Sequence, residues 1–243
     1  MTALRGLGRR TALGRLTLVE LKLFARDPAA AFFTLLLPLL LLVLNANPSP
    51  TIEDRLPGLC VLVLATAGFM WLPETIAGYR ERGILRRQRL APISPVVIIG
   101  AHTGVQVLVA GAGLALLTVV GVTFAGYPPP ADLFAAAAGL LLASATMCAL
   151  GFMLASVARS ARATTAVASA LYFPAIFLSG ATWPRDELPP VGRAVGDVFP
   201  LTYAVDVVRQ PWLEGGLPLT ATLVLLAAIA VAAPLAAATF RWH

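Results

Sequence analysis

Six long apolar segments constrain the possible structures of this chain more than any other feature of its sequence. A helix needs about 20 residues to cross the hydrocarbon core of a bilayer, with a lower limit of about 17. The apolar segments span residues 29–45, 56–78, 96–124, 133–157, 163–179 and 217–240. Prolines inside several of them are compatible with membrane helices, because neighbouring helices can bind the freed carbonyl groups. We therefore predict an all-α membrane protein with six transmembrane helices in a single domain over residues 1–243.

The composition excludes several other classes of protein. Hydrophobic residues make up 58% of the chain and charged residues 12%, against about 45–50% and about 25% in soluble domains. These values exclude a conventional soluble enzyme, a disordered tail and a small secreted domain held by disulfides. Both cysteines, Cys60 and Cys148, lie within apolar segments, so we expect no disulfide and no metal site.

The positive charges predict how the segments are oriented. With the N-terminus inside, 14 of the 18 lysine and arginine residues lie in inner segments, and the four outer ones are Arg55, Arg185, Arg193 and Arg209. Because cytoplasmic connections are enriched in these residues, both termini are expected in the cytoplasm. Arg9-Arg10 superficially suggests a twin-arginine signal. The apolar run begins only at residue 29, however, and no clean A-x-A cleavage site follows it, so we expect the first span to be retained.

Residues 12–27 have the period of an amphipathic helix. One face is apolar, and a narrow basic stripe beside it contains Arg15, Lys22 and Arg26. This pattern is typical of a helix that lies in the interface plane, with its cations at acidic headgroups. Positive charge that merely orients the first span is the alternative. We expect the pair Asp27-Pro28 to begin that span.

The predicted inner loop at residues 79–95 reads YRERGILRRQRLAPISP. It contains five arginines, with Ile84, Leu85 and Leu90 interleaved at near-helical spacing. A solvated, positive-inside loop would need the arginines alone. The interleaved apolar residues favour a short helix that presents an apolar ridge to a cytoplasmic partner. Nucleic acid is a poor explanation for such a small patch beside a bilayer.

The predicted outer loop, residues 181–216, is the longest connection. We expect two short helices in it, one starting near Asp186 with Pro189-Pro190 in its first turn and one following Pro200. Neither can cross a bilayer, so they are predicted to dip into the membrane and return. The loop aromatics are interfacial anchors in one interpretation and functional residues in the other, since loops of this length are usually functional. They are Trp183, Phe199, Tyr203 and Trp212.

Residue types that carry chemistry are sparse. Glu74 is the one acidic residue inside a predicted span, and its place near the inner surface predicts that it reaches water. His102 is expected at the interface, and the sequence contains no proton-relay chain and no nucleophile–base pair. A phosphate-binding loop of the form G-x-x-x-x-G-K-[ST] needs a lysine followed by Ser or Thr. The single lysine, Lys22, is followed by Leu23, so ATP-driven work must come from another subunit.

Three stretches resemble the permease subunits of type-2 ABC exporters, a class that includes drug-resistance and natural-product efflux permeases. They are ELKLFARDPAAAFFTLLLPLLLL at 20–42, YRERGILRRQRLAPISP at 79–95 and FLSGATWPRDELPP…FPLTYAVDVVRQ at 177–210. They match the R-D-P, R-E-x-G-x-L-x-R-x-x-x-x-P-x-S and F-L-S-G…P…L-P…P-L-T-Y patterns of that family, in order. One departure is VVIIGAHTG after Pro95, where many relatives carry a basic residue after the glycine.

The resemblance implies a permease that dimerises with a second permease chain and pairs with two ATPase subunits in the bacterial cytoplasmic membrane. ATP and Mg would be bound by the ATPases, with no cofactor in this chain. The implied ATPase-coupling residues are Arg82, Gly83, Ile84, Leu85, Arg86, Arg87, Leu90, Pro92 and Ser94. The interfacial helix, with Arg15, Glu20, Lys22, Arg26 and Asp27, would add to that contact. The implied outer-gate residues are Phe177, Ser179, Gly180, Leu188, Pro189, Phe199, Pro200 and Tyr203.

Three functions remain open from the sequence. The first is ATP-driven export of a hydrophobic or amphipathic molecule, such as a drug, a natural product or a lipid, by alternating access. The second is a non-transporting membrane scaffold or immunity protein of the same fold. The third, a membrane-embedded enzyme acting on lipids, would need a cluster of carboxylates or histidines near one membrane face, and the sequence contains none.

Overall fold

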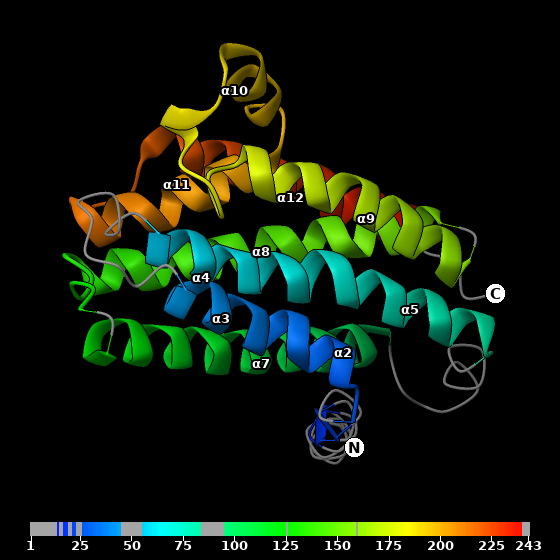
Figure 1. The fold of residues 1–243 in the computed structure, drawn as a ribbon. Coiled ribbons are helices and arrows are strands. Elements are labelled where there is room, and N and C mark those ends of the chain that lie inside the picture. The colour runs from blue at the N-terminus through cyan, green and yellow to red at the C-terminus, as the bar shows by residue number, and fades with distance from the viewer. Residues whose placement is uncertain are drawn as a thin grey trace, which may run out of the picture.

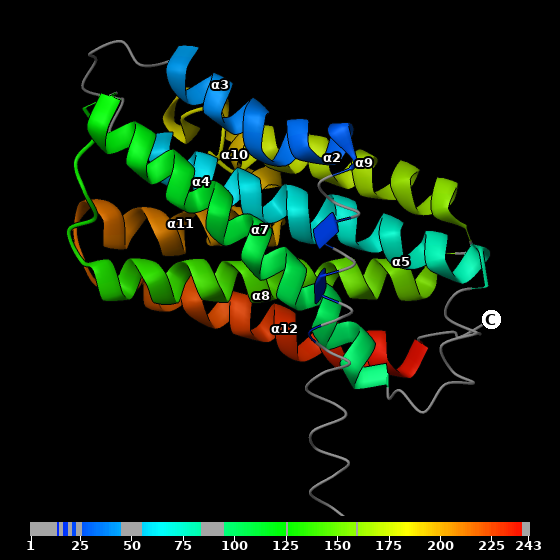
Figure 2. The same cartoon turned by 90° about the horizontal axis from the view of Figure 1, so that it is seen from below.

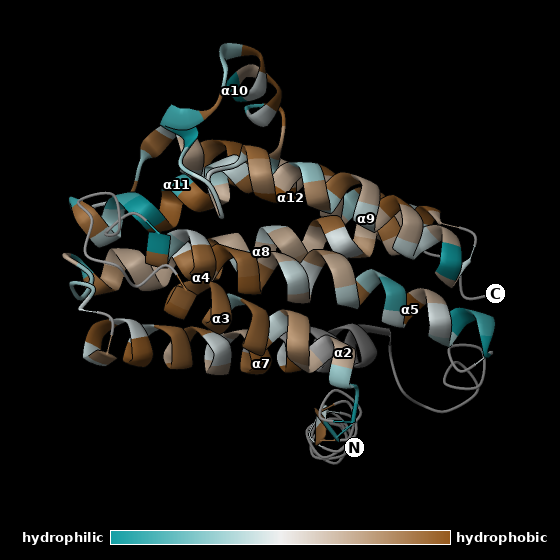
Figure 3. Cartoon of the chain, viewed as in Figure 1, coloured by the Kyte–Doolittle hydropathy of each residue, from teal (hydrophilic) through white to brown (hydrophobic). Residues whose placement is uncertain are grey.

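The computed structural model describes residues 26–44, 55–83, 95–124, 126–158 and 160–239, together with Gly14, Thr17, Leu18, Leu21 and Lys22. Regular structure within these ranges is entirely helical, with no strand. The long helices lie side by side as a bundle, and one short helix stands off its flank (Figure 1). Apolar residues dominate the bundle, whereas hydrophilic residues gather at helix ends and near that short helix (Figure 3).

Two of the helical rods contain a π-helical turn. The first rod comprises α2 (Pro28–Ala31), η1 (Phe32–Leu36) and α3 (Leu37–Leu44). The second comprises α4 (Arg55–Ala65), η2 (Thr66–Trp71) and α5 (Leu72–Glu81). The remaining elements are α7 (Pro95–Phe124), α8 (Leu133–Val157), α9 (Ala161–Leu178), the 3-10 turn η3 (Arg185–Glu187), α10 (Pro190–Gly196), α11 (Pro200–Leu213) and α12 (Leu219–Thr239).

Each predicted span corresponds to a helix over its described residues. Among the described residues, four helices are long and apolar enough to cross a membrane: Arg55–Glu81, Leu133–Val157, Ala161–Leu178 and Leu219–Thr239. Phe32–Leu44 and Leu108–Phe124 are shorter apolar helices within the described parts of the first and third predicted spans. The second span is longer than predicted, because the helix begins at Arg55 and continues to Glu81.

Local sequence signals start several of these helices. Asp132 caps α8, with its Oδ1 atom accepting from the Ala135 N–H at 2.9 Å, and Ser160 caps α9 in the same way through Ala163. The predicted start of the first span at Asp27-Pro28 is confirmed, because Asp27 Oδ1 accepts from the Ala29 N–H at 3.1 Å. Residues 12–25 lie largely outside the described chain, so the interfacial helix stays a prediction.

Helix α8 contacts several other rods of the bundle. It packs against α12, α11, α5 and α4, and Figure 2 shows it lying alongside α12. A row of small residues lies on this helix: Ala143 and Ala155 are fully buried, and Gly139 and Gly151 are also buried. These small side chains let neighbouring backbones approach closely, as membrane helix packing requires where no hydrophobic force drives association.

Two of these glycines lie directly against the backbone of a neighbouring helix. A Cβ atom on Gly139 would overlap the carbonyl oxygen of Val207 in α11. A Cβ atom on Gly151 would overlap the carbonyl oxygen of Gly68 in η2. Since the obstructing atoms are backbone, no rotation of a side chain can relieve the clash.

We therefore expect Gly139→Ala and Gly151→Ala each to lower the free energy of unfolding by about 1–3 kcal/mol, the usual cost of overpacking. The loss is measured by heating the detergent-solubilised chain and monitoring the folded fraction at each temperature by size-exclusion chromatography. The control is Gly111→Ala in α7, where the added Cβ meets nothing within 4 Å. Equal midpoints for all three variants would contradict the close approach.

Candidate functional site

The chain leaves the bundle after α9 and re-enters it before α11. Residues 179–199, which we call the cap, begin with the buried residue Ser179 and with Gly180, whose φ of +85° suits glycine. The cap contains η3 and α10, the helix that stands off the bundle in Figure 1. Phe199 then lies among residues from the middle of η2, α8 and α9. The predicted short helices after Asp186 and Pro200 are confirmed as α10 and α11, although α10 begins at Pro190.

Helix α11 runs from this interior position back to the end of the bundle where α8 begins. The Trp212 indole N–H donates to the Pro128 carbonyl oxygen at 3.1 Å. The backbone N–H groups of Ala131 and Asp132 donate to carbonyl oxygens in the last turn of α11 at 2.9 and 3.0 Å. These bonds hold the C-terminal end of α11 against the start of α8.

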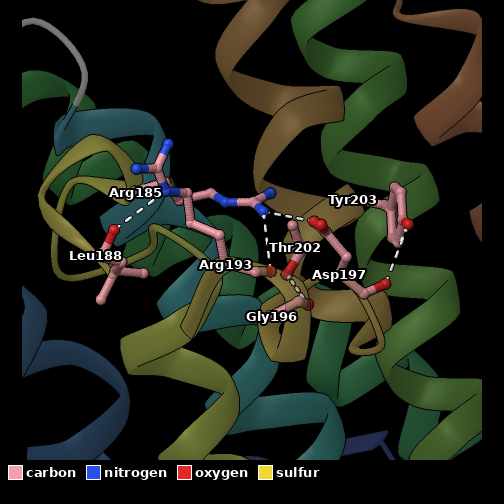
Figure 4. Close-up of polar contacts among 7 residues, drawn as sticks. All are labelled: Arg185, Leu188, Arg193, Gly196, Asp197, Thr202 and Tyr203. Carbon is pink, nitrogen blue, oxygen red and sulfur yellow. Dashed lines mark hydrogen bonds and ion pairs between the residues drawn. The ribbon is translucent and has the colours of Figure 1, made fainter. Parts of the chain in front are cut away.

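Hydrogen bonds hold the parts of the cap together (Figure 4). Arg185 Nη2 lies 2.5 Å from Asp197 Oδ1 and also donates to the Arg193 carbonyl oxygen at 3.4 Å. Arg193 Nε donates to the Leu188 carbonyl oxygen at 3.1 Å. These contacts join η3 to both ends of α10, so the cap is fastened as one unit.

A second set of contacts joins the cap to α11. The hydroxyl of Thr202, which is fully buried, donates to the Gly196 carbonyl oxygen at 2.6 Å. The Tyr203 hydroxyl donates to the Asp197 carbonyl oxygen at 3.1 Å (Figure 4). Both acceptors are at the end of α10, where carbonyl groups lack partners within the helix. The first turn of α11 therefore fixes the end of α10.

Charged residues of α11 face the turn at the start of the cap. Arg209 Nη2 donates to the Gly180 carbonyl oxygen at 2.9 Å. Burial raises the pKa of the Asp206 carboxyl group, while the nearby positive charges of Arg209 and Arg185 lower it and Asp197 raises it further. The chain thus places a partly buried carboxyl group beside two arginines where the cap meets α11.

An apolar cavity of about 160 Å³ lies where Phe199 enters the bundle. Helices α4, η2, α8 and α9 and the start of α11 contribute its walls, and its lining side chains include Phe69, Met147, Met153, Tyr172, Ala175 and Phe199. Among the described residues that line this apolar cavity, none carries a charge. It therefore offers a partly enclosed hydrocarbon surface within the bundle.

The polar atom at the wall of the apolar cavity already has a partner. The Thr66 hydroxyl donates to the Leu62 carbonyl oxygen at 2.7 Å, and the Tyr172 hydroxyl lies 2.6 Å from Thr66 Oγ1. Since a threonine hydroxyl has one proton, Tyr172 is the donor to Thr66. Thr66 is also the first residue of the π-helical turn η2, a feature that recurs at functional sites.

The two aromatic residues predicted together as an outer gate lie on different faces of the structure. Phe199 lines the apolar cavity, whereas Tyr203 lines an open, mixed polar and apolar pocket of about 400 Å³ with Asp206 and Glu214. Of the other predicted gate residues, Ser179 and Gly180 are buried at the start of the cap and Pro200 lines the apolar cavity. Phe177 and Pro189 are exposed, and Leu188 is half-buried.

At the far end of the bundle, two adjacent residues of α5 hold the α8–α9 connection. Arg80 Nη1 donates to the Ala155 carbonyl oxygen at 2.9 Å, and Arg80 Nη2 donates to the Ala158 carbonyl oxygen. Glu81 Oε1 accepts from the Ala161 N–H at 2.9 Å. A cation thus meets the C-terminal end of α8 and an anion the N-terminal end of α9, which is the favourable arrangement for both helix dipoles. We call these contacts the Arg80–Glu81 clamp.

The predicted coupling segment begins directly after the clamp. Arg82 Nε donates to the Gly78 carbonyl oxygen at 3.2 Å, and its guanidinium group lies 5.3 Å from the centre of the Tyr79 ring. Gly83 leaves the helix with φ +67°. The remaining coupling residues lie outside the described chain: Ile84, Leu85, Arg86, Arg87, Leu90, Pro92 and Ser94.

Three of the residues predicted in the interfacial segment belong to the described part of the chain. Lys22 is helical and exposed, Arg26 is exposed in a turn, and Asp27 begins the first rod. Arg15 and Glu20 lie outside the described chain. Sequence reasoning did not find the clamp or the Thr66–Tyr172 contact, since the latter joins residues 106 positions apart. Glu74, which the sequence singled out, is half-buried in the first turn of α5.

Comparison with models of protein families matches residues 11–212 to the ABC-2 type transporter. The chain belongs to this family. It is therefore the multi-pass membrane part of an ATP-driven transporter, and ABC-2 permeases function with ABC ATPase subunits. The matched range covers the clamp, the apolar cavity, the cap and nearly all of α11, and it confirms the family resemblance inferred from the three motifs. A search of the curated proteins finds no match.

No cofactor site in this ABC-2 permease is indicated. Within the described ranges, no group of three or more His, Cys, Asp or Glu side chains could hold a metal ion. Both cysteines are buried free thiols.

The Thr66–Tyr172 contact predicts an unequal pair of mutational effects. Thr66→Val removes the acceptor of a buried phenol and should cost about 1–3 kcal/mol of stability. Tyr172→Phe leaves Thr66 bonded to Leu62 and should cost about 0.5–1.5 kcal/mol. Thermal unfolding of both single variants and the double variant measures the difference. We expect the double variant to lose less than the sum of the two; strict additivity would contradict the contact.

Proposed function

We propose that this chain is the permease subunit of an ABC exporter that moves a hydrophobic or amphipathic molecule out of the cytoplasm by alternating access. The observation that carries the proposal is the apolar cavity, which Phe199 and the start of α11 close on one side. An uncharged, partly enclosed site halfway along the helices suits apolar cargo, such as a drug, a natural product or a lipid. A transporter needs a site for its cargo, whereas a scaffold protein does not, so the cavity favours transport.

The proposed orientation places the Arg80–Glu81 clamp at the cytoplasmic face and the cap outside. It is supported by the distribution of positive charge, since the segment at 79–95 contains five arginines and the cap contains Arg185 and Arg193. In this arrangement all six apolar segments span the membrane and both termini are cytoplasmic. The expected location is the bacterial cytoplasmic membrane.

Energy would enter through the segment at 84–94. The sequence lacks a phosphate-binding lysine motif, so ATP and Mg would be bound by two ATPase subunits that pair with two permease chains. The apolar ridge of Ile84, Leu85 and Leu90 would dock on an ATPase, with the interfacial helix adding to the contact.

The clamp offers a route from that segment to the apolar cavity. Movement of residues 84–94 acts on the end of α5, and Arg80 and Glu81 bind the two helix ends on either side of the α8–α9 connection. Helices α8 and α9 both line the apolar cavity. A shift of these rods between two packed arrangements would change the affinity for cargo, which is what alternating access requires.

The coupling role predicts that Leu85→Asp or Leu90→Asp uncouples the complex. A carboxylate in the apolar ridge would lose its solvation on docking, which costs several kcal/mol. We expect loss of the ATPase from a pull-down of the membrane complex and loss of ATPase stimulation by the permease.

The matched control is Val191→Asp, which introduces the same charge at an exposed cap position and should retain both properties. Intact pull-down and stimulation in both ridge variants would refute the coupling role. If wild-type permease neither binds nor stimulates any ABC ATPase from its own cells, the scaffold alternative is favoured.

The gate role predicts an effect of Phe199→Ala on efflux without an effect on assembly. Removing this ring opens the wall of the apolar cavity, so efflux of amphipathic dyes such as Hoechst 33342 should change severalfold. Tyr203→Ala, on the other face of α11, should have a smaller effect because it loses one hydrogen bond to Asp197. Trp183→Ala, at an exposed position, is the control. Parental efflux in both variants would make Phe199 and Tyr203 interfacial anchors.

A further inference from the structure

The apolar cavity has properties that bear on what occupies it. Its lining is hydrocarbon and thioether from four separate parts of the chain, and the Tyr172 hydroxyl is engaged by Thr66. Water in such a space would lack the two to four polar partners that stabilise a buried water molecule. The space is therefore suited to an apolar occupant.

The volume sets the size of that occupant. A dry apolar cavity of about 150 Å³ in a different, engineered protein binds benzene or xenon, and the cavity here is about 160 Å³. One aromatic ring or a short branched alkyl group has this size. Met147 and Met153 line the cavity with unbranched, adaptable side chains that tolerate variation in the shape of the group.

The rim indicates where a ligand enters. Leu171 lines the cavity and is 44% exposed on α9. Val167 and Phe173 on the same helix are also exposed large apolar residues. The exposed residue Leu171 thus places one wall of the cavity on the outer side of a predicted span, so a ligand reaches the cavity from the hydrocarbon phase.

We propose that this cavity within a single subunit is a binding site for one uncharged aromatic or short aliphatic group, with Ala175 setting its size. The proposal rests on the proposed function for its purpose, since the group belongs either to the apolar part of the cargo or to the acyl chain of a membrane lipid. Ala175 is buried at 6% exposure and lies on the wall that α9 contributes. A larger side chain at this position fills the space.

The test is photolabelling of the full chain in lipid nanodiscs without ATP or ATPase. The probe is 3-trifluoromethyl-3-phenyldiazirine, an uncharged aromatic carbene precursor, and peptide mass spectrometry locates the adducts. We expect adducts on Met147, Met153 and Phe199 at higher yield than on Leu141, which is 64% exposed on the same helix as the two methionines.

Ala175→Phe should lower labelling of the cavity residues by about tenfold, because the new ring occupies the space of the probe. If the phenylalanine variant does not fold, Ala175→Leu replaces it in the test. This smaller side chain should lower labelling of the cavity residues partially. The matched control is Ala170→Phe, the same change at an exposed position of α9, which should leave cavity labelling unchanged. Labelling of Leu141 should be equal in all variants.

A second arm separates the two sources of the group. A phospholipid that carries a diazirine near the middle of one acyl chain should label the same residues if lipid fills the cavity, whereas labelling by the free aromatic probe alone assigns the site to cargo. Both outcomes support the binding site. Cavity labelling no higher than that of Leu141, or unaffected in folded Ala175 variants, overturns it. The labelling uses no ATP, so a failure of the chain to export would not change this result. Conversely, the chain could export in the presence of ATP even if the cavity were not labelled. The two proposals can therefore fail independently.

Discussion

The fold depends on the requirement that every backbone polar group be bonded within the helices where no water is available. Because of this requirement, all the rods are apolar helices of similar composition. Small residues and a few side-chain hydrogen bonds therefore determine which rods pack against each other. Gly139 and Gly151 bring α8 against the backbones of α11 and η2. Thr66 and Tyr172 join the second and fifth predicted spans. Helix α8 contributes the glycine of both close backbone approaches.

The two ends of the bundle are built in different ways, and the difference fits their proposed roles. At the clamp, charged side chains of α5 bind the ends of two other helices, so displacement of α5 reaches α8 and α9 together. At the opposite end, the cap is fastened to itself and to the first turn of α11 by side-chain-to-backbone hydrogen bonds. The apolar cavity lies between these two ends. Alternating access requires a shift between two packed arrangements, and the clamp is the proposed point at which the force enters.

Hydropathy and punctuation residues predicted much of this architecture. Helices occur in all six apolar segments, the first rod begins at Asp27-Pro28, and α11 begins at Pro200. Proline and capping residues act within one turn of their position, so local sequence is sufficient to find them. The apolar cavity and the clamp depend on contacts between distant segments that are all apolar or all arginine-rich, and no local pattern pairs them. For the same reason, no local pattern shows that Phe199, directly before α11, and Tyr203, in the first turn of α11, line different spaces.

The most direct test of the proposed function is to determine on which side of the membrane the cap and the coupling segment lie. Single cysteines at Val191 in the cap and at Arg86 in the coupling segment would be labelled with a membrane-impermeant maleimide; native Cys60 and Cys148 are buried. The account predicts that Val191→Cys reacts in intact cells and that Arg86→Cys reacts only after the cells are permeabilised. Labelling of both positions from the same side, or the reverse pattern, would contradict it.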